Sequence, residues 1–291
     1  MKNIAIHGRK IKSNSFKEVQ ALLHQLTSRK IQLSVSSDFL SLNEVLLSNF
    51  LFEVYTPERA RKKFDAFISI GGDGTFLETL THVGSLEIPI LGINTGRLGF
   101  LASIAQDQIR DAIDKLLKGN YEVEKRSLVF LTSNQKLFNG VNYGLNEFSI
   151  LRKDSSAMIL IKSYLNGDFL NSYWADGLMV STPTGSTGYS LSCGGPILLP
   201  ENENFIISPV SPHNLNIRPL IVPDTSEFSF EVESRTNNFL ISLDSRSQTV
   251  NDNIQMKVKK APFKAYLIKV EGMSFIETLR NKLSWGLDKR N

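Results

Sequence analysis

The feature that most constrains this fold is a glycine-rich turn, Gly-Gly-Asp-Gly-Thr, at residues 71–75. The short apolar run before it, residues 64–70, is typical of a strand that is buried on both faces. Residues 76–83 follow with apolar side chains at helical spacing. The turn is therefore predicted to join a strand to a helix at the carboxyl edge of an open α/β sheet, where such sheets bind their ligands.

The composition of this turn indicates an anion site with an additional task. Glycines let the backbone approach a bulky anion, and a helix start offers unpaired N–H groups, so Gly71 and Gly72 are assigned to a phosphate group. Asp73 is negatively charged, and a simple phosphate cradle does not need it. Its carboxylate suits either a metal-bound phosphate or a hydroxyl that must lose its proton. An aspartate at this position can also do no more than cap the helix.

The composition excludes several classes of protein. At 291 residues the chain is long enough for two domains, and no apolar run approaches the length of a membrane span. The N-terminus leads directly into a predicted strand at residues 3–7 rather than into a signal peptide. Cys193 is the only cysteine, which excludes a disulfide framework and a cysteine-rich zinc site. We therefore expect a cytoplasmic protein without a membrane partner.

The charge pattern favours small polyanions as ligands. The formal net charge is +4, and the basic residues are scattered along the chain, so we expect no nucleic-acid partner. The four histidines lie far apart in the sequence and lack the spacing of metal ligands. Each is expected to be structural, and no metal ligands are assigned.

The order of predicted strands and helices divides the chain. Up to residue 122, strands alternate with helices, which argues for an α/β domain with a parallel sheet. Residues 123–272 hold many short β-rich runs, including a hairpin with Asn-Gly at its turn, and predict an all-β second domain. Residues 273–291 indicate an amphipathic helix. We expect this helix to return to the first domain, where it can bury its apolar face.

Two further stretches are too polar or too rich in glycine to be core. Residues 94–100 follow another predicted buried strand; Asn94 and Arg97 are assigned to phosphate, and Phe100 can either face an adenine or lie in the core. Residues 143–147 end in Asn146 and Glu147. An amide beside a carboxylate can read a hydroxyl pair or a base edge through directed hydrogen bonds, although an exposed loop can carry the same pair.

Residues 174–196 form a third such stretch, dominated by hydroxyl groups and glycines. They offer backbone N–H groups and short donors to a polar ligand, and Tyr189 adds a ring that can stack on a base or a nicotinamide. A flexible linker has a similar composition, but Pro183 and Pro196 are unusual in linkers. The chain lacks a Walker-type loop, a Gly-x-Gly-x-x-Gly fingerprint and the protein-kinase signatures, so it would bind ATP or a dinucleotide by another design.

Taken together, these stretches resemble the NAD kinase family across the whole chain. The resemblance rests on Gly-Gly-Asp-Gly at residues 71–74, residues 92–100, the Asn-Glu pair at 146–147 and the run from residue 176 to 196, with a further match at residues 213–220. Lipid kinases and phosphofructokinases also carry Gly-Gly-Asp-Gly. The long Thr-Pro-Thr-Gly-Ser-Thr run is far more specific.

The resemblance implies both a fold and a reaction. The implied fold is a Rossmann-like N-terminal domain followed by a β-sandwich-like domain. The implied reaction transfers the γ-phosphoryl group of ATP to the 2′-hydroxyl of the adenosine ribose of NAD, which gives NADP. The resemblance also implies a divalent cation, Mg²⁺, and a homodimer or homotetramer.

The resemblance further implies roles for individual residues, some of them across subunits. Asp73 is the implied proton acceptor, and it also contacts NAD. The other residues implied to contact NAD are Gly74, Leu77, Phe100, Asn146, Glu147, Ala157, Trp174, Asp176, Thr187, Gly188, Tyr189, Ser190, Leu191, Ser192, Asp244 and Arg246. Three positions depart from the family: Gly188 stands where many members have alanine, and Ala157 and Trp174 stand where some have a basic or imidazole side chain.

Two other functions share parts of this pattern. A lipid or sugar kinase can carry the same glycine turn, although the polar Ser/Thr run argues against an acyl pocket. A non-catalytic NADP sensor would bind the dinucleotide without turnover, although an intact Asp73 argues against it. Formation of NADP from ATP and NAD separates all three hypotheses.

Overall fold

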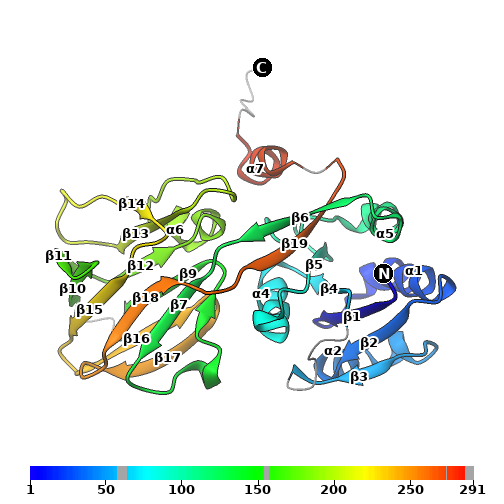
Figure 1. Cartoon of the computed structure of the whole chain (residues 1–291), viewed down its shortest axis with the longest axis horizontal. Helices are drawn as coiled ribbons and strands as arrows, with labels where there is room; N and C mark the ends of the chain where they lie inside the picture. Colours follow the sequence, from blue (N-terminus) through cyan, green and yellow to red (C-terminus); the bar gives the residue numbers. More distant parts are fainter. Residues whose placement is uncertain (58–63, 154–156, 273, 286–291) are drawn as a thin grey trace. The chain divides into compact units, whose positions relative to one another are not determined.

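The computed structural model describes residues 1–57, 64–153, 157–272 and 274–285 of the chain, which form two compact units (Figure 1). The first unit combines Met1–Lys125 with the segment from Ala265 onward, and the second unit is Arg126–Lys264. No helix among these described residues has the length and apolar character needed to cross a membrane.

The first unit is built on a seven-stranded sheet of order β3-β2-β1-β4-β5-β19-β6, in which every neighbouring pair from β3 to β19 is parallel. Its strands are β1 (Asn3–Gly8), β2 (Gln32–Ser36), β3 (Glu53–Tyr55), β4 (Ala66–Gly71), β5 (Ile90–Asn94), β6 (Tyr121–Arg126) and β19 (Ala265–Val270). Its helices are α1 (Phe16–Ser28), α2 (Ser37–Leu42), α3 (Glu44–Leu47), α4 (Asp73–Val83), α5 (Ile109–Lys118) and α7 (Phe275–Leu283). The predicted α/β fold of the N-terminal part is confirmed.

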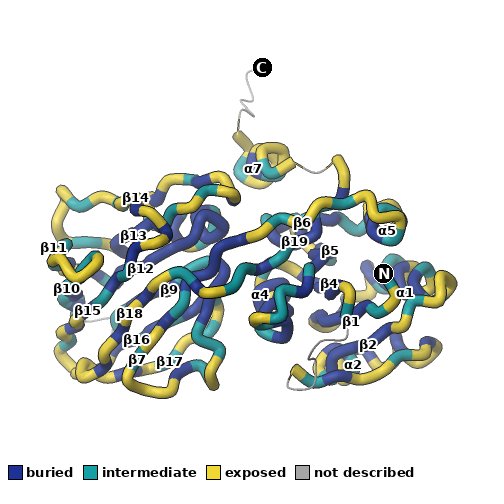
Figure 2. Tube along the Cα trace, in the orientation of Figure 1, coloured by how far each residue is buried: buried dark blue, intermediate teal, exposed yellow. Residues whose placement is uncertain are grey.

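Hydrophobic patterning explains the central elements of this unit. Strand β4 is buried at every position, as expected for a strand in the middle of a parallel sheet (Figure 2). Helix α1 buries Val19, Leu22, Leu23 and Leu26, whose spacing puts them on one face. The apolar faces of the helices and the strands therefore share one core.

The second unit contains two six-stranded antiparallel sheets, of order β11-β10-β15-β18-β7-β8 and β14-β13-β12-β9-β16-β17. The strands are β7 (Val129–Ser133), β8 (Tyr143–Gly144), β9 (Glu147–Arg152), β10 (Ile159–Leu165), β11 (Asp168–Ala175), β12 (Gly177–Ser181), β13 (Asn204–Val210), β14 (Leu220–Pro223), β15 (Phe228–Glu233), β16 (Asn238–Leu243), β17 (Arg246–Asn251) and β18 (Met256–Lys260). A short helix, α6 (Tyr189–Ser192), lies between β12 and β13.

The two antiparallel sheets share a single hydrophobic core. Leu131 and Ile161 enter this core from one sheet, and Ile150 and Ile207 enter it from the other. The β-sandwich-like fold predicted for the second domain is thereby confirmed. At the predicted hairpin between β10 and β11, both turn residues have positive φ, 53° for Asn166 and 93° for Gly167, as a type I′ turn requires.

The chain returns to the first unit earlier than the sequence predicts. The predicted β domain extends to residue 272, but β19 pairs in parallel with β5, through Leu267 and Ile90, inside the seven-stranded sheet. Along β19, Tyr266 and Lys269 are half-buried and the other four residues are buried, a pattern that does not distinguish a parallel from an antiparallel sheet. The sheet to which β19 belongs is set by its partner strand, β5, which lies far away in the sequence, and a local pattern does not identify that partner. Helix α7 follows β19 and belongs to the same unit.

Candidate functional site

The glycine turn lies where it was predicted, at the carboxyl end of a central parallel strand. Strand β4 ends at Gly71, Gly72 is the N-cap of α4, and Asp73 is the first residue of the helix. Gly72 and Gly74 are exposed, with open space around them. Their backbone N–H groups stand at a helix N-terminus, which favours a bound anion. Leu77, one turn further along α4, is buried with 8 % of its surface exposed.

Asp73 does not cap its own helix. Its carboxylate instead accepts three backbone hydrogen bonds from the loop after β5: Phe100 N–H donates to Oδ2 (2.9 Å), and the N–H groups of Leu101 and Ala102 donate to Oδ1 (both 3.0 Å). An ionised carboxylate has about four lone-pair positions, two on each oxygen. Oδ1 uses both of its positions on the loop, whereas Oδ2 keeps one for another donor.

The loop between β5 and α5 is shaped to receive this carboxylate. A Cβ atom at Gly99 would lie 1.8 Å from Asp73 Oδ1, so only glycine fits there. Asn94 is buried, and its side-chain amide forms hydrogen bonds within its own loop. It donates to the carbonyl of Arg97 (2.6 Å) and accepts from Gly96 N–H (2.6 Å). Arg97 itself is exposed. Of the two residues assigned to phosphate here, Arg97 is the one whose side chain reaches solvent.

Phe100 is half-buried and is contacted by α7. The ring of Phe275 lies 6.1 Å from the Phe100 ring, and Nζ of Lys282 lies 4.8 Å from its centroid. The same ammonium lies 3.7 Å from Asp73 Oδ2. Sequence reasoning missed Lys282, because its position in an amphipathic helix far along the chain gives no sign of this proximity.

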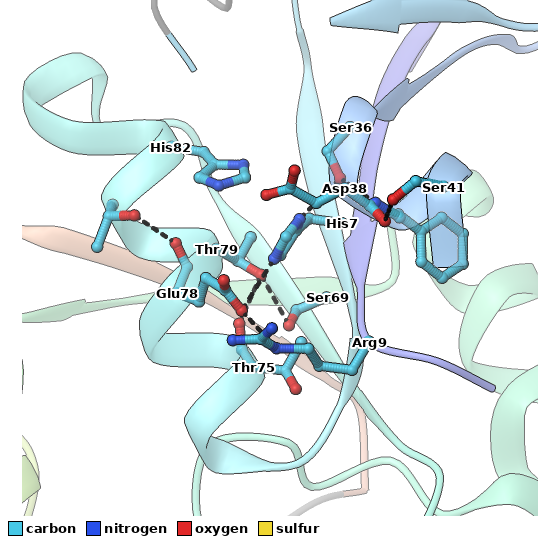
Figure 3. Close-up of polar contacts among 12 residues, drawn as sticks. His7, Arg9, Ser36, Asp38, Ser41, Ser69, Thr75, Glu78, Thr79 and His82 are labelled. Atoms are coloured by element: carbon cyan, nitrogen blue, oxygen red, sulfur yellow. Dashed lines mark hydrogen bonds and ion pairs between the residues drawn. The ribbon is translucent and has the colours of Figure 1, made fainter. Parts of the chain in front are cut away.

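A buried polar network holds α4 against the sheet (Figure 3). His7, at the end of β1, contacts Ser36 Oγ through Nδ1 (2.8 Å) and the Glu78 carboxylate through Nε2 (3.3 Å). Arg9 adds an ion pair with Glu78 at 2.9 Å. The hydrogen bond with His7, working against burial, lowers the pKa of Glu78. The contacts of His7 and Arg9 with Glu78 thus tie α4, the helix that carries Asp73, to the end of β1 and the residues that follow it.

In the second unit, Asn146 and Glu147 lie at the start of β9, and their backbone N–H groups bind the side chain of Asp244. The Asp244 carboxylate accepts the N–H groups of Leu145 (2.9 Å), Asn146 (2.7 Å) and Glu147 (3.2 Å). Asp244 follows β16, and Arg246 is the first residue of the next strand, β17. The Arg246 side chain donates to the carbonyl groups of Val141 and Tyr143. Within this chain, Asp244 and Arg246 thus contact the backbone that carries the Asn-Glu pair.

Glu147 has an environment that is unusual for a carboxylate. The residue as a whole is half-buried, but its Oε2 is shielded from solvent and has no hydrogen-bond partner among the described residues. Burial, and then the charge of Asp244, raise the pKa of Glu147 to about 8. A buried polar atom without a partner costs free energy that a polar ligand can recover. The pair therefore has the properties of a ligand site.

The hydroxyl-rich stretch is an ordered segment and not a flexible linker. It forms a 3-10 helix, η6 (Thr184–Thr187), and α6, and Thr184, Gly185 and Ser186 are buried. A Cβ atom at Gly185 would lie only 2.0 Å from the carbonyl oxygen of Asn146, so the segment packs directly on the Asn-Glu pair. One at Gly188 would lie 3.4 Å from Glu147 Oε2. The structure thus brings together two stretches that the sequence assigns to NAD.

The remaining residues of this segment differ in accessibility. Tyr189 and Ser192 are exposed, and Thr187 and Leu191 are half-buried. Ser190 is fully buried, with its hydroxyl 3.3 Å from that of Ser208. Burial, followed by the charges of Cys193, Asp176 and Glu147, raises the pKa of Tyr189. The Tyr189 ring therefore stands within electrostatic reach of two predicted NAD contacts.

Ala157 and Trp174 line a groove of about 610 Å³ on the second unit, together with Arg152 and Arg235. Trp174 is 54 % exposed. The Arg152 side chain forms an ion pair of 2.9 Å with Asp176. The predicted contacts of the second unit thus lie around the Asn-Glu pair and around this groove, whereas Asp73, Gly74, Leu77 and Phe100 belong to the first unit. No cluster of three or more potential metal-ligating side chains occurs in the described ranges.

Comparison with known proteins gives concordant matches over nearly the whole chain. Residues 9–121 match the model of the ATP-NAD kinase N-terminal domain, and residues 145–270 match that of the C-terminal domain. The NAD kinase of Cytophaga hutchinsonii is 51 % identical over 290 residues, and that of Flavobacterium psychrophilum is 44 % identical over 292; each match covers 99 % of both chains.

Two solved structures share the fold at low sequence identity. The yeast NADH kinase complexed with NADH has a TM-score of 0.88 at 22 % identity, covering 99 % of this chain and 89 % of that one. An NAD kinase from Archaeoglobus fulgidus in complex with ATP has a TM-score of 0.72 at 24 % identity, covering 98 % of both. At this identity the two structures support the architecture described above.

Proposed function

The chain belongs to the NAD kinase family, and from that premise we propose that Asp73 is the base that activates the 2′-hydroxyl of the adenosine ribose of NAD. The protein is an ATP-dependent NAD kinase that forms NADP. The observation that carries the proposed role is the geometry of the carboxylate. Three loop N–H groups orient Asp73, and Oδ2 retains one acceptor position at the carboxyl edge of the sheet.

The proposed step needs a base because a ribose hydroxyl is a weak nucleophile. Asp73 Oδ2 accepts the hydroxyl proton as the oxygen forms its bond to the γ-phosphorus, and the bond from that phosphorus to the departing ADP breaks. A positioned base contributes about 10²–10⁴-fold to such a rate. Gly72 and Gly74 are exposed residues at the N-terminus of α4, where backbone N–H groups suit the charge of a phosphate group.

We propose that Mg²⁺ enters with the phosphates of ATP. Nucleotide-bound Mg²⁺ typically takes one or two carboxylates and several phosphate oxygens and waters. The described residues include no cluster of three or more side chains that could hold a metal, which fits this mode better than a protein cage. When bound, the ion neutralises charge on the transferred phosphoryl group. We also propose a cytoplasmic location, because the cytoplasm supplies both substrates, ATP and NAD.

The function is tested by incubating the protein with ATP, Mg²⁺ and NAD and by measuring NADP with a coupled dehydrogenase. NADP should accumulate only when all three are present. Dinucleotide binding without NADP formation would instead support the sensor hypothesis. Phosphorylation of a lipid or a sugar in place of NAD would support the rival kinase.

We propose that the Asn-Glu pair and the segment 187–192 bind the dinucleotide, with Tyr189 as a stacking surface. Replacing Tyr189 with alanine should raise the KM for NAD by about tenfold or more, because stacking of a base on an aromatic ring contributes about 1–3 kcal/mol. The KM for ATP should change little. Tyr164→Ala, on the β10–β11 hairpin, is the matched control. Equal effects on both substrates would place NAD elsewhere.

We also propose that the active unit is a homodimer or homotetramer. The edge strand β14 exposes Leu220 and Ile221, and Leu215 nearby in sequence is 83 % exposed. Exposed apolar side chains on a sheet edge favour association. Dilution below the dissociation constant of the oligomer should lower specific activity, and NAD should shift the assembly toward the oligomer by mass action. Light scattering at the assay concentration checks this, and a fully active monomer would contradict it.

A further inference from the structure

Helix α7 carries a lysine, Lys282, at the C-terminal end of its apolar face. Phe275, Leu279 and Lys282 follow one another at spacings of four and three, so they lie on the same side of the helix. Phe275 contacts the Phe100 ring, and Leu279 is buried. Lys282 occupies the third position of this otherwise apolar face. Arg280 lies in the same turn on another side of the helix, and both Arg280 and Lys282 are exposed residues.

The Lys282 ammonium has two neighbours in the first unit. It lies 4.8 Å from the centroid of the Phe100 ring and 3.7 Å from Asp73 Oδ2. Oδ2 is the carboxylate oxygen that accepts only one N–H group from the loop. The cation therefore stands beside the acceptor position that the hydroxyl group of the substrate would use.

This placement matters for the charge of the transferred group. The phosphoryl group is transferred to the hydroxyl that is bound to Asp73 Oδ2, so it arrives close to that oxygen. Its negative charge is spread over its three outer oxygens. A cation 3.7 Å from Oδ2 is close enough to contact one of those oxygens as the phosphoryl group arrives. An exposed ion pair alone is worth little to stability, so the pair with Asp73 gives a weak structural reason for a lysine on this face.

We propose that Lys282 is a catalytic residue, whose ammonium binds an oxygen of the phosphoryl group during its transfer to the hydroxyl held by Asp73. The hydroxyl proton goes to Asp73, the new bond joins the ribose oxygen to phosphorus, and the bond to ADP breaks. This role rests on the proposed function of Asp73.

Four full-length variants test the proposal. Lys282→Ala removes both the charge and the side-chain stem, Lys282→Met keeps a stem against Phe100, and Lys282→Arg keeps the charge. Arg280→Ala removes a cation from a side of the same helix other than the one that carries Phe275, Leu279 and Lys282. We expect kcat to fall by about 10²-fold in both Lys282→Ala and Lys282→Met, since the loss of one donor to a transition-state charge commonly has this effect. Lys282→Arg should retain most of the activity, and Arg280→Ala should match the unmodified protein.

The pattern across the variants decides between charge and packing. Near-normal kcat in Lys282→Met would show that the stem alone matters and would overturn the proposal. Equal kcat in Lys282→Ala and Arg280→Ala would also overturn it. An Asp73→Asn variant separates the two levels of inference: if it is inactive while Lys282→Met is active, only the role of Lys282 fails. If Asp73→Asn is active, the proposed function of Asp73 fails first.

Discussion

Replacing Asp73 with asparagine is expected to lower kcat by about 10²-fold or more while NAD still binds. Asparagine keeps the shape of the side chain but cannot take the hydroxyl proton. Steady-state kinetics measure the loss of turnover, and calorimetric titration with NAD measures whether binding is preserved. Near-normal turnover in this variant would remove Asp73 from the mechanism.

The same substitution has a structural cost that the geometry predicts. An amide has one oxygen, so its NH₂ group would face at least one of the N–H donors of Phe100, Leu101 and Ala102. Leaving a donor without a partner costs about 1–3 kcal/mol, which thermal unfolding can measure. Asp65→Asn is the control, because Asp65 accepts both of its backbone N–H groups, from Lys2 and Asn3, on the single oxygen Oδ2, away from the site. The amide oxygen of asparagine can accept both groups, so this variant should lose less stability than Asp73→Asn and keep the turnover.

Adding a single methyl group at Gly185 is expected to damage both the fold and the dinucleotide site. The new Cβ would lie 2.0 Å from the carbonyl oxygen of Asn146 and 2.5 Å from its carbonyl carbon. These are backbone atoms, and the Asn146 carbonyl already accepts the N–H of Thr182 (2.9 Å). We expect the free energy of unfolding to fall by about 3 kcal/mol. Displacement of the Asn-Glu pair should raise the KM for NAD by about 10–100-fold.

Gly188→Ala provides the comparison for this variant. Its Cβ would lie 3.2 Å from the nearest atom, the carbonyl oxygen of Gly185, so a shift of a few tenths of an ångström accommodates it. Thermal unfolding and the KM for NAD should both change much less than in Gly185→Ala. If the two alanine variants behave alike, the close approach at Gly185 does not position the Asn-Glu pair.

Local pattern was sufficient for the features that depend on neighbours in sequence. The strand at β4, the helix α4 and the turn between them follow from burial pattern and glycine chemistry within a short window. The Asn-Gly hairpin between β10 and β11 follows from the φ angles that its turn requires. Membership in the family followed from motif order, because several motifs occurred together in one chain.

Features that depend on distant pairing could not be predicted in this way. Asp244 holds the backbone of residues 145–147 across about a hundred positions of sequence, and nothing near it indicates that partner. Gly99 is required by the carboxylate of Asp73, which belongs to another element. The position of Lys282 could not be predicted for the same reason, because only the fold brings α7 beside the Asp73 carboxylate.

The position of β19 also sets the order in which the chain can fold during synthesis. In the seven-stranded sheet, β19 lies between β5 and β6, so β6 cannot join that sheet until β19 has been made. The second unit is one continuous segment, Arg126–Lys264, and leaves the ribosome before β19 does. Domains usually fold from the N-terminus as they are translated. Here the β unit can be completed while the first unit still waits, with an open sheet edge, for its last strand.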